Sequence, residues 1–490
     1  MLLAGRRVLS QFPLYQMFDS HYKKDAVIIG GGISGLAIAY RLQRAGLNIL
    51  LVEKSARVGG ALLTEEIDGF LVDCGPNSTL ETSPEIGHFM DEIGLQGRRI
   101  YANPSAKKRF ILKNGNLLAL PMNPFQFLAC RLFSIQAKLR LLAEPFIPAA
   151  PEELEETIAQ FVRRRLGKEF LDYAINPFVA GIYAGDPARL SVRSAAAKIY
   201  ALEKNYGSLV KGAIKVAKQR QKMSETSKTK ARLFSFQNGM TELANALAEI
   251  LANSIQKRSI LDRVELPGAS GDFYTLSISQ KTKRIKIAAK SLIFATPAHV
   301  TAGYLKSIDK SLSAKLQKIT YPPVAVVFSG FKKQVPCRPL DGFGFLVPRV
   351  ENRRILGTIW NSAIFPNRAP EGGFCLTTFI GGMRQPDLPQ LDDRELGELV
   401  FDELKDVMQL QEKPDVLHIK RWEKAIPQYE LGHQNSINEI EKLETEHPGL
   451  FISGNFRNGI SVGDCIVQSK SLSSKIVDYC TKCVPESEVA

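Results

Sequence analysis

The chain has 490 residues, of which 44% are hydrophobic, as is typical of a globular protein with two or three domains. This length excludes a single small domain, and the composition excludes a largely disordered chain. The 64 Lys and Arg residues outnumber the 50 Asp and Glu residues, and the resulting net charge of +14 favours acidic partners. Seven cysteines spread along the chain favour a reducing, cytoplasmic location over a disulfide-stabilised secreted protein.

The first 23 residues are interpreted as a tail outside the fold. They carry Arg6, Arg7 and Lys23 against the single acid Asp19, and they lack an apolar core long enough for a secretion signal. Two interpretations stay open: a targeting segment, or a true start later in the chain, at Met17. No uninterrupted apolar run reaches the roughly 18 residues that a transmembrane helix needs, so any membrane association would be peripheral.

The first folded unit that the sequence predicts is a strand, a glycine-rich turn, a helix and a second strand. An apolar run at 25–29 precedes Gly-Gly-Gly-Ile-Ser-Gly at 30–35, and the helical pattern that follows stops at Gly46. Residues 48–52 form the next buried strand, which ends at Glu53. This order is typical of the opening unit of a doubly wound, Rossmann-like sheet.

The rest of the chain predicts a helical insertion followed by a half rich in strands. Residues 86–145 are mostly helical, and a further helix is expected from 151 towards 167. The elements expected after this insertion are, in chain order, strand 233–236, helix 240–251, strands 274–278, 285–287, 292–295, 321–330, 343–348, 354–360 and 373–381, helix 391–411, strand 450–453 and helix 465–480. Because a strand–glycine–helix unit returns at the extreme end, the sequence predicts an α/β (α+β) fold with interleaved domains.

The spacing of Gly30, Gly32 and Gly35 predicts a site for a dinucleotide. Gly30 permits the tight turn, Gly32 leaves room for a diphosphate, and Gly35 allows the helix to approach the sheet. Unpaired N–H groups at the start of the following helix favour the negative diphosphate. Glu53 can accept hydrogen bonds from ribose hydroxyls and would repel a 2′-phosphate, so NADP is disfavoured. The alternative is a tight glycine turn that binds nothing.

Three further turns favour FAD over NAD, because a flavin also needs a cradle for its ribityl chain and ring. Arg57 stands just before a second glycine pair, Gly59 and Gly60, and another turn follows at 73–78. Near the far end, residues 454–465 lead into the last helix. The N-terminus of that helix can stabilise negative charge on a reduced flavin ring.

On these residues the chain resembles the flavin-dependent amine oxidase superfamily and, within it, the oxygen-dependent protoporphyrinogen/coproporphyrinogen oxidase family. The widely shared motifs are GGGISG…EKSARVGG near the start and GNFRNGISVGDCI near the end. Four internal stretches are more specific to the porphyrinogen oxidases, namely 108–121, 180–194, 342–348 and 426–433. Together the motifs extend from residue 25 to about residue 480.

The resemblance implies a noncovalently bound FAD and three interleaved domains. The expected segments are 24–100, 232–300 and 448–484 for a Rossmann-like FAD-binding domain, 101–120 and 301–447 for a mixed-sheet substrate-binding domain, and 121–231 for a helical domain that contacts membrane or lines a channel. A homodimer stays open.

The resemblance also implies the residues of the site. Arg109 falls where the family places a cation on a substrate propionate, and Gly181 falls where backbone approaches the macrocycle. Phe343 and Leu346 fall where apolar side chains sandwich that ring. Without the resemblance, Arg109 would be interpreted as a surface charge and the two apolar residues as strand packing. The positions that fall on flavin contacts are Gly30, Gly32, Ile33, Ser34, Gly35, Glu53, Lys54, Arg57, Gly59, Gly60, Pro76, Asn77, Ser78, Val264, Trp422, Gly459, Ile460, Ser461 and Val462.

The activity that the resemblance implies is oxidation of a porphyrinogen in haem biosynthesis. A hydride would pass from a meso carbon to flavin N5 in each of three rounds, and O2 would reoxidise the flavin and yield H2O2. Protoporphyrinogen IX is favoured over coproporphyrinogen III as the substrate. Two alternatives stay open on the same fold: a flavin amine oxidase, with Trp422 and Tyr429 before the ring, and a noncatalytic flavin-binding protein associated with a membrane.

No catalytic side chain and no metal is assigned from the sequence. It offers no Ser/His/Asp or Cys/His constellation, and the flavin would carry the chemistry. Cys480 and Cys483 have the spacing of a metal-binding pair, but no second pair or His cluster accompanies them. We interpret that spacing as chance.

Two segments bear on further partners. Residues 125–146 place Phe and Leu side chains between basic residues, so a peripheral membrane patch or channel lining and interior packing both stay open. The hydrophobic substrate that the resemblance implies favours weak membrane contact slightly. Residues 204–232 carry nine Lys or Arg against the single acid Glu225, and a solvated loop or frayed helix is the preferred interpretation. Anionic lipid comes second. Nucleic acid is not predicted as a partner, because aromatic residues are not interleaved with the charge.

Overall fold

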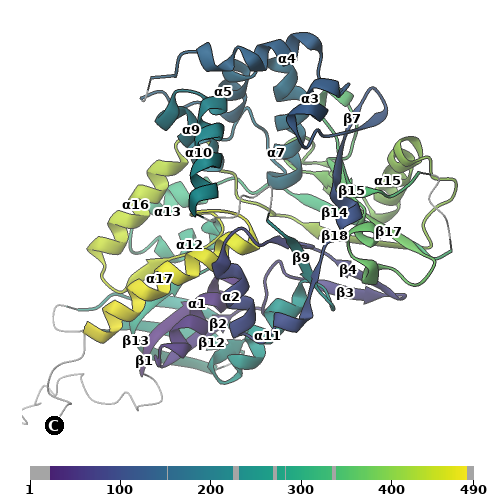
Figure 1. The fold of residues 1–490 in the computed structure, drawn as a ribbon. Coiled ribbons are helices and arrows are strands. Elements are labelled where there is room, and N and C mark those ends of the chain that lie inside the picture. Colours follow the sequence, from purple (N-terminus) through teal and green to yellow (C-terminus); the bar gives the residue numbers. More distant parts are fainter. Residues whose placement is uncertain are drawn as a thin grey trace, which may run out of the picture.

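The computed structural model describes residues 23–151, 153–223, 231–268, 273–281, 283–333 and 338–482. Within these residues, two seven-stranded sheets lie beside one another, and a helical lobe lies at the top of the view (Figure 1).

The first sheet joins segments from the beginning, the middle and the end of the chain. Its order is β10-β2-β1-β13-β12-β11, and β19 also pairs with β13. β1 pairs in parallel with both β2 and β13, as a Rossmann-like start requires. The strands are β1 (Lys23–Ile29), β2 (Ile49–Glu53), β10 (Ile255–Lys257), β11 (Ser259–Glu265), β12 (Tyr274–Gln280), β13 (Lys283–Phe294) and β19 (Leu450–Ile452).

Helices cover both faces of this sheet. Ala26 and Ile28 of β1 belong to the apolar core on one face, whereas the alternate residues Val27 and Ile29 belong to the core on the other. Burial on both sides explains why β1 and β2 are continuous apolar runs. The first layer contains α1 (Ile33–Arg44), α2 (Pro84–Glu92), α11 (Thr241–Ile250) and α17 (Val462–Lys482), and the second contains α12 (Ala298–Leu305), α13 (Lys310–Gln317) and α16 (His433–Glu446).

The second sheet is mixed, with the order β18-β14-β17-β16-β15-β7-β8. β7 comes from the N-terminal part of the chain and pairs in parallel with β15. Helix α15 (Asp393–Met408) packs its apolar side on one face of this sheet. The strands are β7 (Lys108–Lys113), β8 (Asn116–Ala119), β14 (Val324–Phe331), β15 (Gly342–Leu346), β16 (Gly357–Ile359), β17 (Phe374–Gly381) and β18 (Val416–Trp422).

The helical lobe is held by ion pairs as well as by apolar packing. Arg165 is fully buried and pairs with Glu144 at 3.1 Å and with Glu203 at 2.5 Å. Removing one partner of such a network would leave a buried charge uncompensated, so the network fixes how these helices pack. The helices are α3 (Pro124–Ala129), α4 (Ile135–Leu142), α5 (Ile158–Arg165), α6 (Lys168–Phe170), α7 (Asn176–Tyr183), α8 (Val192–Ala195), α9 (Ala197–Tyr206) and α10 (Leu209–Met223).

Shorter elements connect the sheets. A hairpin and a three-stranded sheet with the order β5-β9-β6 lie between them. These elements are β3 (Thr64–Ile67) and β4 (Phe70–Asp73) in the hairpin, β5 (Thr79–Leu80), β6 (Arg99–Tyr101) and β9 (Leu233–Phe236) in the small sheet, and α14 (Asn361–Ile364).

The expected α/β (α+β) class with mixed sheets is confirmed, while the domain boundaries stay a prediction. Two of the expected elements were predicted wrongly. Residues 86–145 were expected to be mostly helical, but the strands β6, β7 and β8 lie within this segment, because β6 pairs with β9, and β7 pairs with β15 and β8. One helix start was also placed too early. The helix expected from 151 begins at Ile158, because Thr157 and Gln160 form a capping box that sets its first turn. Among the described residues, no helix has both the length and the apolar composition to cross a membrane.

Candidate functional site

The first glycine turn has the geometry of a diphosphate cradle. Gly30 has a φ of 108°, and a side chain there would lie 2.7 Å from Ala295 O. A Cβ on Gly32 would meet nothing within 4 Å among the described residues, so its space opens outward, whereas one on Gly35 would lie 1.9 Å from Gly30 O. No side chain of the described residues caps α1 at Gly32, so the N–H groups of its first turn are free for an anion. These residues fit the diphosphate of a dinucleotide.

The carboxylate of Glu53 is held beside this turn. Its Oε2 accepts a hydrogen bond from Gly31 N at 2.8 Å, and its Oε1 accepts one from Ser55 N at 2.7 Å. Each carboxylate oxygen keeps a lone pair for a further donor such as a ribose hydroxyl. The neighbouring Lys54 is exposed, and its charge helps to lower the pKa of His299, for which burial is the main cause.

The second glycine turn packs against the first. Gly32 and Gly59 form a parallel bridge, and Gly59 N donates to Gly31 O at 2.7 Å. Arg57 turns back onto this loop and donates to the carbonyls of Gly60 at 2.7 Å and Leu62 at 3.1 Å. Arg57 therefore braces the turn in this structure, and a direct flavin contact for it stays a prediction.

The turn at 75–78 contacts the end of β18. It includes the predicted flavin contacts Pro76, Asn77 and Ser78. Trp422 Nε1 donates to Cys74 O at 2.8 Å, and a Cβ on Gly75 would lie 3.8 Å from the Trp422 ring. The three turn residues are half-buried, and Ser78 Oγ donates to Asn77 Oδ1 at 2.9 Å. The structure thus brings Trp422 of the second sheet to this predicted flavin turn, 344 or more residues away in sequence.

The turn before α17 is tied to the start of α16. Gly459 N donates to the Tyr429 hydroxyl at 2.9 Å, and that hydroxyl donates to Asn455 O. Tyr429 stacks on His433 at 4.3 Å, and His433 Nε2 lies 2.8 Å from Phe456 O. Tyr429 is 3% exposed, so it supports the glycine turn and is not available for an aromatic cage.

The N-termini of α1 and α17 lie together. Ser461 caps α17, because its Oγ accepts a hydrogen bond from Asp464 N at 3.0 Å; the same Oγ donates to Asp464 Oδ2 at 2.6 Å. Ser34 in the first turn of α1 is buried and interacts with Cys465 of α17. Val462 is buried, and Ile33 and Ile460 are half-buried. The two helix starts that the sequence assigned to flavin contacts are therefore neighbours in space.

A bulge presents the predicted substrate residues. The register between β15 and β7 shifts at Gly342 and Gly344, and Gly344 has a φ of 136°, which favours glycine. The unpaired residue between them is Phe343, whose ring lies 5.4 Å from the Arg109 guanidinium carbon. Arg109 is accessible to solvent, yet partial loss of hydration lowers its pKa. It forms no ion pair with any carboxylate of the described residues.

Gly181 of α7 and Leu346 of β15 pack against each other. A Cβ on Gly181 would lie 2.5 Å from Leu346 Cδ2, so the absence of a side chain lets α7 approach β15. Phe178 and Ile182, on the same helix, are 51% and 42% exposed. Phe343 and Leu346 are half-buried and each packs partly against an apolar cluster of the interior, whereas Arg109 is exposed. A guanidinium beside half-buried and exposed apolar side chains suits a flat, hydrophobic, anionic ligand.

Val264 is the predicted contact that the structure leaves without support. It lies on β11, at the edge of the first sheet, half-buried against the core that α12 and α13 share. Its flavin contact stays a prediction.

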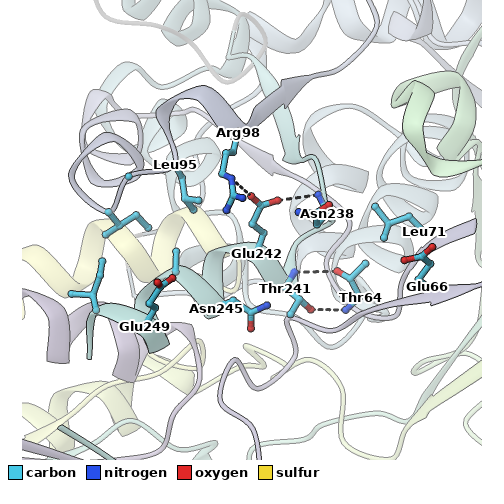
Figure 2. A pocket seen from close by; sticks show the side chains of 14 residues that line it. Thr64, Glu66, Leu71, Leu95, Arg98, Asn238, Thr241, Glu242, Asn245 and Glu249 are labelled. Atoms are coloured by element: carbon cyan, nitrogen blue, oxygen red, sulfur yellow. Dashed lines mark hydrogen bonds and ion pairs between the residues drawn. The ribbon is translucent and has the colours of Figure 1, made fainter. Parts of the chain in front are cut away.

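A separate polar cavity of about 490 Å³ lies on α11 and the β3–β4 hairpin (Figure 2). Glu242 is its central acid: Asn238 N donates to it at 2.9 Å and Arg98 pairs with it at 3.1 Å. None of the predicted site residues lines this cavity. Its lining residues are Thr64, Glu66, Leu71, Ile93, Gly94, Leu95, Arg98, Asn238, Thr241, Glu242, Asn245, Ala246, Glu249 and Ile250.

Sequence reasoning missed two features that shape the site. The bulge at Phe343 has a local signal, because the residue stands between two glycines. The role of Tyr429 has none, because its partners Asn455 and Gly459 lie 26 and 30 residues away.

Comparison with known proteins agrees with this geometry. Residues 33–476 match the family described as flavin containing amine oxidoreductase. The chain is 32% identical over 484 residues to protoporphyrinogen oxidase 2, chloroplastic/mitochondrial, of Arabidopsis thaliana, covering 94% of this chain and 95% of that protein. It is 29% identical over 472 residues to coproporphyrinogen III oxidase of Bacillus subtilis (strain 168), covering 93% and 98%.

A crystal structure of a protein assigned as a protoporphyrinogen oxidase from Exiguobacterium sp. 255-15 shares the fold, with a TM-score of 0.78 at 24% identity, over 94% of this chain and 99% of that one. The family match and these relatives show that the chain is an FAD-dependent oxidoreductase. The chain belongs to the flavin-containing amine oxidoreductase family and, within it, to the protoporphyrinogen and coproporphyrinogen oxidases.

Proposed function

We propose that this protein oxidises a porphyrinogen to the porphyrin, with protoporphyrinogen IX as the favoured substrate. The observation that carries this proposal is Arg109, an accessible guanidinium without a carboxylate partner among the described residues, beside the Phe343 ring that the bulge presents. A propionate would pair with Arg109, and the macrocycle would lie on the apolar surface of Phe343 and Leu346.

The substrate preference rests on the relatives. The Arabidopsis protein, at 32% identity, is named for protoporphyrinogen, and the Bacillus protein, at 29%, is named for coproporphyrinogen III. One cation at Arg109 suits either substrate.

The redox chemistry would come from noncovalently bound FAD, which supplies a hydride acceptor. Each round removes one hydride and one proton from the porphyrinogen, and three rounds remove the six electrons that separate it from the porphyrin. With O2 as the acceptor, three O2 become three H2O2. The chain's own residues would bind and orient the ring, and this positioning supplies much of the rate.

The experiment uses the purified flavin-loaded protein under air with three substrates supplied separately. Protoporphyrinogen IX, coproporphyrinogen III and a primary amine are compared by porphyrin fluorescence and by H2O2. Porphyrin formed with three H2O2 per molecule supports the proposal, and the faster substrate identifies the preference. Peroxide with the amine alone would support an amine oxidase, and bound flavin without turnover would support a noncatalytic protein. The buried, hydrogen-bonded Tyr429 disfavours the amine oxidase, because it is unavailable for a cage.

We further propose that the helical lobe contacts a membrane surface peripherally. Seven of the eleven Phe, Leu, Ile and Met residues between 122 and 146 are exposed, for example Phe125 at 85% and Phe146 at 86%, whereas Leu132 and Phe133 are buried. Lys211 of the basic helix α10 donates to Pro145 O at 3.1 Å, so positive charge lies next to Phe146. Apolar side chains flanked by cations suit an anionic lipid surface. This apolar patch comprises Met122, Phe125, Leu128, Ile135, Leu139, Leu142 and Phe146.

A further inference from the structure

Three potential metal ligands from distant parts of the sequence converge beside the β3–β4 hairpin. Glu65 lies on β3, Cys74 follows β4, and His418 lies on β18. His418 Nε2 is 3.1 Å from Glu65 Oε2 and 3.7 Å from Cys74 Sγ, and all three ligand atoms lie within 4.8 Å of one another. In the sequence, only the spacing of Cys480 and Cys483 was considered, and no metal was assigned. Cys74 and His418 are 344 residues apart, so no local spacing pattern joins them.

The arrangement does not suit a nucleophilic cysteine. In a Cys–His–acid relay the thiol and the carboxylate use the two different ring nitrogens of the histidine. Here Glu65 and Cys74 both approach Nε2 of His418. Cys74 is also 0% exposed, and burial, with the Glu65 charge as a lesser cause, raises the pKa of its thiol to about 12. A buried, protonated thiol is inert towards substrates.

The separations instead match ligands around one ion. Zinc bonds to sulfur, imidazole nitrogen and carboxylate oxygen measure about 2.0 to 2.3 Å, so tetrahedral ligand atoms lie about 3.3 to 3.6 Å apart. The two measured distances, 3.1 and 3.7 Å, bracket this range. The Glu65 side chain is 40% exposed and the His418 side chain 27%, so the fourth position faces water.

We propose that Glu65, Cys74 and His418 form a binding site for a Zn²⁺-like transition-metal ion. Thiolate and imidazole ligands select such an ion over Mg²⁺ or Ca²⁺, which prefer oxygen ligands alone. On binding, the Cys74 sulfur bonds to the metal and its proton passes to solvent. The thiolate and the Glu65 carboxylate then balance the two positive charges of the ion.

The site would join the hairpin to the second sheet. His418 lies on β18, opposite Phe328 of the neighbouring strand β14. Glu65 lies on the hairpin strand β3, and Cys74 directly follows its partner β4. Trp422, four residues further along β18, already donates to Cys74 O at 2.8 Å. A bound ion would therefore add a second link beside the turn at 75–78 that we predict to contact the flavin. We expect the ion to raise the melting temperature of the holoenzyme.

The experiment titrates the metal-stripped, flavin-loaded protein with Co²⁺ and then displaces it with Zn²⁺. Tetrahedral Co²⁺ absorbs at wavelengths longer than oxidised flavin does, so its signal is separable. The variants Cys74→Ser and His418→Gln are compared with a control, Cys480→Ser/Cys483→Ser, which removes the competing cysteine pair near the C-terminus. Circular dichroism and flavin content report whether each variant folds.

We expect one ion per chain, an affinity at least about tenfold weaker in each site variant, and an unchanged affinity in the control. Zinc X-ray absorption of the wild-type protein provides a readout that needs no variant: one sulfur and the remainder nitrogen or oxygen in the first shell. Four results would each overturn the proposal. They are no bound metal, unchanged binding in both site variants, loss of binding only in the Cys480→Ser/Cys483→Ser control, and a first shell with two sulfurs.

Discussion

Two glycines of the same turn, Gly32 and Gly35, have different roles. The space around each glycine shows which role it has. A side chain on Gly35 would collide with Gly30 O at 1.9 Å, so this glycine is required by the protein's own packing. A side chain on Gly32 would meet no described atom within 4 Å, so the protein alone does not need glycine there. The close packing at Gly35 agrees with the role that the spacing motif predicts for it, whereas the diphosphate contact at Gly32 stays a prediction.

We predict that Gly32→Val folds and loses its flavin. A Cβ at this position meets no described atom within 4 Å, so the side chain would extend into the space that the diphosphate needs. The expected protein is colourless, with a circular dichroism spectrum like that of the flavin-free wild type. Gly35→Ala is the matched comparison, and it should fail to fold stably. Retention of FAD by Gly32→Val would contradict the assignment of this turn.

The Arg109 guanidinium gives a second prediction at this scale. Arg109→Ala should raise KM for the porphyrinogen roughly 10- to 100-fold, the value of a hydrogen bond to a charged group, and leave flavin content unchanged. Arg109→Lys should recover part of the affinity, because it keeps the charge but loses the planar fork.

The neighbouring Lys108 provides a control, because it is exposed and paired with Asp341 at 2.5 Å. Lys108→Ala should leave KM within about twofold of the wild-type value, since surface ion pairs contribute little. Steady-state kinetics on all three variants measure this. An unchanged KM in Arg109→Ala would remove the propionate role.

At the scale of elements, the starts of α16 and α17 are held together by Tyr429 and His433. The histidine is 6% exposed, and burial lowers its pKa from 6.5 to about 4, although the nearby Glu155 charge and the contact with Phe456 O act in the opposite direction. In the unfolded chain the same histidine has its ordinary pKa of about 6.5. Below that value the unfolded state therefore binds a proton that the folded state rejects.

We predict that His433 destabilises the protein as pH falls from about 6.5 to 4, by an amount on the order of 3 kcal/mol across the full interval. This penalty is absent well above pH 6.5, since the histidine is then neutral in both states. Melting temperatures measured across this interval should depend less steeply on pH in His433→Gln than in the wild type. The exposed His88 on α2 supplies the control, because His88→Gln should keep the wild-type slope. Equal slopes in the His433 variant would contradict the prediction.

Elements were predictable where their signals were local. The first strand, turn and helix, and the positions of α11, α15 and α17, followed from periodicity and capping residues. The start of α5 was placed too early, because Pro-Glu-Glu at 151–153 was interpreted as the first turn. The Thr157 capping box instead begins the helix at Ile158. The bulge at Phe343 depends on pairing with β7, more than 230 residues away, so periodicity alone could not reveal it, although the flanking glycines are a local signal.

At the scale of the whole molecule, the order of motifs predicted interleaved domains but not which strands pair. β7 joins the second sheet beside β15, and β19 joins the first sheet beside β13. Such pairings depend on contacts between residues hundreds of positions apart, and a single sequence does not encode them locally. The convergence of Glu65, Cys74 and His418 is invisible in the sequence for the same reason.

The exposed apolar patch of the helical lobe leads to a prediction about membrane binding. It depends on which side chains of residues 125–146 the folded lobe exposes. The sequence left membrane contact and interior packing both open for residues 125–146. In the structure the segment divides, since Phe133 is 5% exposed and stacks on Phe170, whereas Phe125 and Phe146 are 85% and 86% exposed. Burying one such ring in lipid contributes about 1.5 to 3 kcal/mol.

The double variant Phe125→Ser/Phe146→Ser should therefore bind anionic vesicles at least about 100-fold more weakly than the wild type, with porphyrinogen turnover in detergent unchanged. Ile260→Ser is the control, because Ile260 is 51% exposed but lies on β11 of the first sheet, outside the patch. Cosedimentation with vesicles at low and high salt measures both the apolar and the electrostatic components of membrane binding. Salt should weaken binding of the wild type, because α10 places Lys211 beside the patch and its attraction to headgroups is screened. Equal cosedimentation of the double variant and the wild type would show that these rings do not enter the lipid and would leave charge alone to account for any binding.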